Sequence, residues 1–184
     1  MKPSTETVIL NSFLTLLSKR PPNKITVKDI VEDCGVNRNT FYYHFAGIPE
    51  LLERLMKLGA DHIMSNYRSV PSLEACLSNV MTLAQEYRRA ILSIYQSNYR
   101  ELYERYLLEI CGRLAADYVD SLHSDSQLSA EDRAAIVQAY KCECFGQIIN
   151  WMNGNMRAEL QNRFLRSIAL RQGSTEQLFQ SNAI

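Results

Sequence analysis

The stretch "ITVKDIVEDCGVNRNTFYYHF", residues 25–45, decides the fold. Its first half carries the signals of a short helix. Thr26 is a good N-cap, Asp29 stands three residues later as the partner of a capping box, and Gly35 stands where a helix end favours a left-handed residue. One apolar face follows the i, i+3, i+4, i+7 spacing of a buried stripe: Val27, Ile30, Val31 and Cys34.

The second half of the stretch predicts another short helix, over about residues 38–45, that begins at an Asn37 cap. At 100° per residue, Phe41 and Phe45 fall on its core side, and polar and tyrosine side chains occupy the other faces. Two short helices joined by a glycine turn form the helix-turn-helix pattern, whose second helix enters the major groove of DNA.

The polar side chains on and beside this second helix have the chemistry of DNA contacts. Arg38 can donate two hydrogen bonds to guanine, and Asn39 can pair with both edge groups of adenine. Hydroxyl, imidazole and ammonium groups nearby can contact phosphate oxygens, which fixes register without reading sequence. The predicted DNA-binding set is Thr26, Lys28, Asn37, Arg38, Asn39, Thr40, Tyr42, Tyr43 and His44. A merely solvated helix of a bundle would explain Asn37 as a cap, but not why two adjacent tyrosines face water.

The length of 184 residues, with 46% hydrophobic and 22% charged residues, is that of an ordinary globular protein. No apolar run is long enough for a transmembrane helix, and no small-residue cleavage site follows the amphipathic N-terminal stretch. We therefore expect a cytoplasmic protein with no membrane partner. The formal net charge is zero, although residues 1–45 hold six basic and four acidic residues, a net of +2. This small asymmetry does not decide for or against nucleic acid.

Cysteine and histidine usage gives no sign of a metal site or an active site. The five cysteines are scattered, and the two sulfurs of "CEC" at 142–144 fall on different sides of a helix. Only three histidines are present, with no nucleophile–base signature and no phosphate-cradling glycine loop. We therefore expect reduced thiols, no metal, no cofactor and no enzymatic activity.

Helical periodicity continues along the rest of the chain, and no segment has the pattern of a strand. The expected helices cover about residues 5–19, 27–34, 38–45, 49–67, 73–96, 99–122, 130–153 and 156–171. The sequence therefore predicts an all-α protein of about nine helices. Its expected parts are a helix-turn-helix domain at 1–46, a helical regulatory and dimerisation domain at 47–172, and a polar C-terminal tail at 173–184.

The opening stretch, preceded by an amphipathic helix at the N-terminus, resembles the tetracycline-repressor (TetR/AcrR) family of bacterial transcriptional regulators. The resemblance covers about residues 8–55 and rests on the run "T-hydrophobic-x-x-I-…-G-V-x-x-x-T-F-Y-x-H-F". It implies three DNA-binding helices, then a fourth helix that leads to a variable helical domain for ligand binding and dimerisation. It also implies DNA contacts by Thr26, Lys28, Arg38, Asn39, Thr40, Tyr42, Tyr43 and His44.

One position departs from the family pattern. Members commonly carry a lysine at the start of the fourth helix, as a phosphate contact, whereas the segment "AGIPEL" has Ile48 there. One fewer phosphate contact is expected to reduce the salt dependence of DNA binding by about one unit of slope.

The last two predicted helices resemble the dimerisation pair of this family. Apolar stripes at helical spacing run along both, and an intramolecular core uses part of this surface. We expect a homodimer whose interface is a four-helix bundle, with two helices from each chain. The predicted interface residues are Phe145, Ile149, Met152, Leu160, Phe164 and Ile168.

Tyrosines crowd the middle helices, where they have two interpretations. A tyrosine can line a ligand cavity with an apolar ring and one polar group. Equally, tyrosines at helical spacing are commonly core edges with the hydroxyl in water. The predicted effector-pocket residues are Met81, Tyr103, Tyr106, Cys111 and Tyr118, and no cluster of acids or bases indicates a strongly charged ligand.

These patterns predict a dimeric DNA-binding regulator, a repressor of the TetR/AcrR type, that binds a palindromic operator. A small-molecule or protein effector at the C-terminal domain would control it. The alternative is a regulator of the co-activator type, which acts through a protein partner and binds DNA weakly alone. The neutral charge and Ile48 leave room for this alternative.

Overall fold

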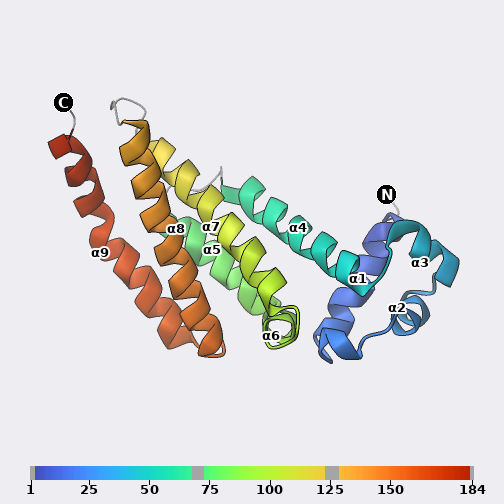
Figure 1. Ribbon diagram of the computed structural model, residues 1–184. Coiled ribbons are helices and arrows are strands. Elements are labelled where there is room, and N and C mark those ends of the chain that lie inside the picture. Colours follow the sequence, from blue (N-terminus) through green and yellow to red (C-terminus); the bar gives the residue numbers. More distant parts are fainter. Residues whose placement is uncertain (1–2, 68–72, 123–128, 183–184) are drawn as a thin grey trace. The chain divides into compact units, whose positions relative to one another are not determined.

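A computed structural model of the protein describes residues 3–67, 73–122 and 129–182. Within these ranges the chain forms nine α-helices and one short 3₁₀ turn (Figure 1). They are α1 (Thr5–Leu17), η1 (Pro22–Lys24), α2 (Val27–Cys34), α3 (Arg38–His44), α4 (Ile48–Tyr67), α5 (Leu73–Glu86), α6 (Arg88–Tyr95), α7 (Arg100–Leu122), α8 (Ala130–Asn153) and α9 (Ala158–Asn182). The all-α prediction is confirmed. None of these helices, within the described ranges, is both long and apolar enough to cross a lipid bilayer.

The chain folds into two compact units. The head unit contains the residues up to His62 together with Ala84–Tyr106. The body unit contains Ile63–Leu83 together with the residues from Leu107 onward. Helix α6 therefore belongs to the same unit as the helix-turn-helix, although it lies far from it along the sequence.

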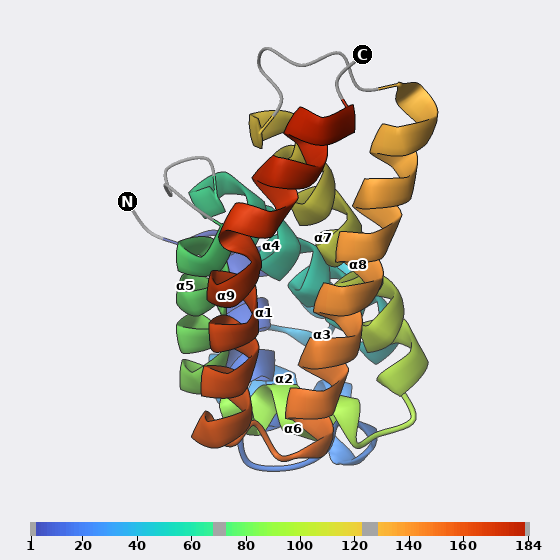
Figure 2. The ribbon, with the colours of Figure 1, turned by 90° about the vertical axis from the view of Figure 1, so that its left-hand side faces the viewer.

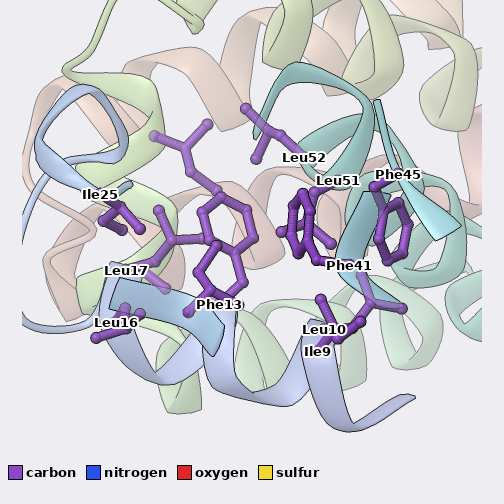
Figure 3. Packing of buried hydrophobic residues seen from close by; sticks show 13 residues of the cluster. Ile9, Leu10, Phe13, Leu16, Leu17, Ile25, Phe41, Phe45, Leu51 and Leu52 are labelled. Carbon is purple, nitrogen blue, oxygen red and sulfur yellow. The ribbon is translucent and has the colours of Figure 1, made fainter. Parts of the chain in front are cut away.

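Helix α1 supplies much of the core of the head unit. Ser4 caps it by accepting a hydrogen bond from the Thr7 backbone N–H at 3.2 Å, and its apolar stripe is buried as predicted. Ile9 and Phe13 have no exposed surface, and they pack in one cluster with residues of α2, α3, α4 and α6 (Figure 3). Burial of large apolar side chains from five helices therefore holds the head together.

The helix-turn-helix forms as its capping residues predict. Thr26 Oγ1 accepts from the Asp29 N–H at 3.2 Å and Asp29 Oδ2 accepts from the Thr26 N–H at 2.8 Å, which completes the capping box. Gly35 follows α2 with a φ of 70°, in the left-handed region. Asn37 Oδ1 then accepts from the Asn39 N–H at 2.8 Å and starts α3. Each of these helix ends has a local cause in the sequence.

The prediction of one helix over residues 73–96 is wrong. The chain breaks at Tyr87, whose φ of −99° and ψ of 14° are not helical, and α5 and α6 are separate helices. After the break, α6 packs against α1 and buries Ala90 and Ile94 in the core of the head unit. Periodicity missed the break because packing on a distant helix produces it, without a proline or glycine to mark it.

A tight turn joins α8 to α9 in the body unit, and these two helices lie side by side (Figures 1 and 2). Asn155 and Met156 have positive φ values of 55° and 53°, and the Met156 N–H donates to the Trp151 carbonyl at 2.8 Å. Trp151 Nε1 donates to the Arg157 carbonyl at 3.1 Å. The buried Trp151 therefore holds the turn, and α9 begins at Ala158, two residues later than predicted.

The predicted end of the last helix at about residue 171 is also wrong, because α9 runs to Asn182. Most of the predicted polar tail at 173–184 is therefore helical. No proline interrupts this segment, and one glycine, Gly173, costs a helix only about 1 kcal/mol relative to alanine. Polar composition alone did not distinguish a polar helix from an irregular tail.

Gly35→Ala is expected to lower the free energy of unfolding by about 1 kcal/mol or more, because alanine is strained at a left-handed φ. No atom lies within 4 Å of a Cβ built at Gly35, so the cost is backbone strain. Gly59→Ala in α4 is the matched control, since it also has open space around its Cβ and no left-handed φ. Urea unfolding should show stabilisation by up to about 1 kcal/mol for this control. Similar effects of the two substitutions would contradict the role of the Gly35 backbone.

Candidate nucleic-acid interface

Helix α3 is held from behind by two buried rings. Phe41 has no exposed surface and Phe45 is 4% exposed, and both pack in the core of the head unit (Figure 3). On another face Tyr43 is 85% exposed. The other exposed side chains of α3 are Arg38, Asn39 and Tyr42, while Thr40 and His44 are half-buried at the flanks. The predicted division of α3 into a core side and a solvent side is confirmed.

Two exposed polar groups of α3 form no hydrogen bond with another described residue. Among the described residues, nothing bonds to the carboxamide of Asn39 or to the hydroxyl of Tyr43, whose ring only contacts His44 edge-on at 5.1 Å. A carboxamide in the first turn of the second helix has the position and donor–acceptor pair that adenine recognition requires. These groups are therefore available to a ligand outside the chain.

The start of α2 has an exposed cation, Lys28, and a cap at Thr26 whose hydrogen-bond donors are both used. The Thr26 N–H and Oγ1–H both donate to Asp29 Oδ2, at 2.8 and 2.7 Å. The backbone N–H and the hydroxyl of Thr26 therefore both donate within the cap. The side chain of Lys28 is 75% exposed, and its ammonium group lies 3.7 Å from the carboxylate of Glu32, whose side chain is 65% exposed. Such a long, exposed contact competes little with a phosphate for the ammonium group.

The cap carboxylate is also the centre of an ion pair. Arg20 Nη2 lies 2.9 Å from Asp29 Oδ1. The hydrogen bonds from Thr26, followed by that from Arg20, lower the pKa of Asp29 to about 2. The carbonyl of Arg20 in turn accepts a hydrogen bond from Ser93 Oγ of α6 at 3.2 Å. The connection between α1 and α2 is therefore tied to both α2 and α6.

The start of α4 has an apolar residue and an acidic cap in the place of a phosphate-binding cation. Ile48 is half-buried and packs against the core of the head unit. Glu50 Oε2 accepts a hydrogen bond from the Ala46 N–H at 2.6 Å. Ile48, at the position of the family's lysine, thus has a packing role, and the carboxylate of Glu50 adds negative charge two residues later.

Two family models match the chain over these same elements. The model described as "Bacterial regulatory proteins, tetR family" matches residues 9–55, from α1 to the first part of α4. The model described as "Transcriptional regulator C-terminal region" matches residues 71–163. The chain belongs to the TetR family of DNA-binding transcriptional regulators. This family is not enzymatic, which confirms the prediction that the chain is not an enzyme.

Solved structures of transcriptional regulators are similar along nearly the whole chain. The dihydroxyacetone kinase operon activator DhaS is 19% identical with a TM-score of 0.59, and the alignment covers 90% of this chain and 97% of DhaS. The TetR family repressor AlkX from Dietzia sp. strain DQ12-45-1b is 12% identical with a TM-score of 0.56, over 97% and 96% of the two chains. The fatty acid degradation regulator FadR from Bacillus halodurans is 14% identical with a TM-score of 0.57, over 91% and 95%. At these identities the likeness shows the TetR fold alone. No curated protein matches the chain.

The TetR fold divides the five predicted effector-pocket residues between the two units. Tyr103 and Tyr106 belong to the head unit, and Tyr103 packs against its core. Met81, Cys111 and Tyr118 are buried in the body unit. No single unit contains all five, so their grouping around one effector stays a prediction.

Three buried thiols lie in the body unit of this TetR chain. Burial raises the pKa of Cys76 to about 11, that of Cys111 to about 12 and that of Cys144 to about 11. Cys142, two residues before Cys144, is exposed, as expected from the opposite directions of the two side chains on α8. Within the described ranges, no three His, Cys, Asp or Glu side chains gather in a way that could hold a metal ion.

The head unit of this TetR chain also contains a surface hollow of about 290 Å³. It is lined by Leu14 and Ser18 of α1 and by residues 85–90. This hollow was not predicted from the sequence, because its lining residues come from two segments that are far apart along the chain.

Two of the six predicted interface residues are interior in a single TetR chain. Met152 and Phe164 are each 1% exposed, so they pack within the body unit. The other four, Phe145, Ile149, Leu160 and Ile168, are half-buried. Leu170, which is 65% exposed, is an apolar surface residue that the sequence analysis missed because it lies off the i+4 stripe of α9.

Asp29→Asn is expected to be less stable than the wild type at neutral pH, and this difference should shrink as the pH falls. Asp29 has its pKa lowered from 3.8 to about 2, so its ionised form favours the folded state. The contribution is complete above the unfolded pKa and is lost between about pH 4 and pH 2. Urea unfolding at several pH values measures the difference.

Glu32→Gln is the matched control for Asp29→Asn, because Glu32 has one exposed and distant partner. Its stability should follow that of the wild type across the same range. A difference between Asp29→Asn and the wild type that stays constant down to about pH 2 would count against the ionised cap.

Proposed function

We propose that this TetR protein is a homodimeric repressor that binds a palindromic operator and is released by an effector bound to its C-terminal part. The observation that carries the proposal is the exposure of Arg38, Asn39 and Tyr43 on a helix whose other side is fixed by Phe41 and Phe45. Polar residues in that position reach base edges when the second helix of the motif enters the major groove.

The proposed contacts follow the chemistry of each side chain. Arg38 donates twice to guanine, and Asn39 pairs with adenine, which gives sequence preference. Phosphate contacts come from the surrounding polar groups: Lys28, Thr40, Tyr42, Tyr43 and His44. Asn37 and Thr26 act through the helix caps that they form, which aim the first turns of α3 and α2.

Dimerisation would use the exposed parts of α8 and α9, two helices from each copy. The half-buried residues Phe145, Ile149, Leu160 and Ile168 support this proposal, and so does the exposed Leu170. Two recognition helices about 34–36 Å apart read two half-sites with the combined affinity of both. A palindromic operator is the counterpart of such a two-fold arrangement.

Residues 1–46 are the proposed DNA-reading part, and residues 47–172 are the proposed regulatory part. A small molecule or protein that binds the regulatory part must favour one arrangement of the two heads over another, since equal affinity for both shifts nothing. The hydrogen bond from Ser93 of α6 to the Arg20 carbonyl supports a structural link between the regulatory part and the segment that precedes α2.

A second candidate function is regulation through a protein partner, with weak autonomous DNA binding. Ile48 and Glu50 at the start of α4 favour it, because Ile48 replaces an expected phosphate contact and the carboxylate of Glu50 adds negative charge two residues later. DhaS, which has the same fold, is named an operon activator, so at least one similar structure is that of an activator.

Selection of bound duplexes from a random pool, with purified wild-type protein at low salt, tests the two candidates. The first predicts a palindromic consensus, and it predicts that Arg38→Ala abolishes the retarded migration of a consensus duplex in a gel at protein concentrations that suffice for the wild type. Asn39→Ala is expected to relax specificity at one base pair per half-site by about 1–3 kcal/mol. Uniform weakening on all sequences would contradict a base-reading role for Asn39. No retardation of any duplex would favour the partner-dependent function.

Leu170→Glu is expected to weaken the dimer by placing a carboxylate at the proposed interface, with little cost to the fold because Leu170 is 65% exposed. Leu58→Glu, at a 40% exposed leucine of α4 outside α8 and α9, is the matched control. Sedimentation velocity over a range of concentrations should show more monomer for Leu170→Glu than for the wild type or the control. If Leu170→Glu dimerises like the wild type, Leu170 and the part of α9 around it do not belong to the dimer interface.

A further inference from the structure

The side chain of Arg38 is restrained by its own helix. Its Nη2 lies 3.5 Å from the hydroxyl oxygen of Tyr42, one turn later, and can donate a long hydrogen bond to it. Its Cζ lies 5.7 Å from the centroid of the Tyr42 ring, within the range of a cation–π interaction. Two contacts with one partner therefore limit the rotamers of a long and otherwise exposed side chain.

Tyr42 is itself held in place. Its ring meets the ring of Phe41 edge-on, with centroids 5.5 Å apart and an interplanar angle of 86°. Phe41 has no exposed surface and belongs to the core of the head unit, whereas Tyr42 is 47% exposed. A line of contacts thus runs from the core through Tyr42 to the guanidinium of Arg38.

We infer that Tyr42 is a positioning residue for base recognition, which sets the guanidinium of Arg38 for a guanine in the operator. This inference rests on the proposed function, because it assumes that Arg38 reads a base. The physical reason is that a restrained guanidinium loses less rotamer entropy when it forms its two hydrogen bonds to guanine. Asn39 has no such restraint among the described residues, so the effect is specific to the base pair that Arg38 contacts.

The hydroxyl of Tyr42 can serve two partners at once. As acceptor it takes the Arg38 N–H, and its own proton stays available for a phosphate oxygen. A phosphate contact of this kind changes the affinity for all sequences equally, whereas the contact with Arg38 changes the ratio of affinities between sequences. The ratio therefore isolates the positioning role from any phosphate contact.

The matched variants are Tyr42→Phe and Tyr42→Leu in the full-length protein. Phenylalanine keeps a ring beside the guanidinium and loses the hydroxyl, whereas leucine is apolar, forms helices well and has no π face. Both lose the hydroxyl, so a phosphate contact cancels in their comparison. Circular dichroism and thermal unfolding establish that each variant is folded.

The measurement is a competition assay with the consensus duplex selected from the random pool and a panel in which each base pair of the half-site is replaced in turn. Tyr42→Leu is expected to lower discrimination at the Arg38 base pair by about two- to fivefold relative to the wild type. Tyr42→Phe should keep that discrimination. In the Arg38→Ala background, Tyr42→Leu should have no further effect on it.

Equal discrimination by Tyr42→Leu and Tyr42→Phe at this base pair, or a loss spread evenly over the panel, would overturn the positioning role. So would a loss that persists in the Arg38→Ala background. If the wild type selects a consensus and Arg38→Ala relaxes one base pair, any of these results defeats this inference alone. If the wild type shows no sequence preference, the proposed function fails, and the role of Tyr42 fails with it.

Discussion

The burial of Phe41 and Phe45 in the head core is the interaction on which the rest of the DNA-reading surface depends. Fully burying an aromatic ring contributes about 1.5–3 kcal/mol, whereas a helix cap contributes about 1 kcal/mol. The two rings therefore fix which way α3 faces, and the Asn37 cap fixes where it starts. Every polar group on the outer face of α3 takes its direction from these two constraints.

The parts of the fold that were predictable from the sequence are those whose causes are local. The capping box at Thr26, the left-handed Gly35 and the Asn37 cap lie within a few residues of the helix ends that they determine. The core-facing Phe41 and Phe45 followed from helical periodicity alone. The exposed polar side of α3 was identified correctly by the same argument. Once the buried residues of a helix are known, the side opposite to them faces solvent.

The features that the sequence did not predict depend on contacts between distant segments. The break at Tyr87 exists because α6 packs on α1, and no residue type marks it. Met152 and Phe164 have the same periodic spacing as their neighbours on α8 and α9, so periodicity could not separate the body core from a surface for a second copy.

The difference between buried and exposed cysteines has a practical consequence for following the folding of this protein. Thiolates react with alkylating reagents and thiols do not, so Cys76, Cys111 and Cys144 are protected twice, by lack of access and by a raised pKa. Cys142 is open to the same reagents in the native state. The number of labelled sulfurs among the four body-unit cysteines therefore reports whether the body unit is folded, without an engineered cysteine.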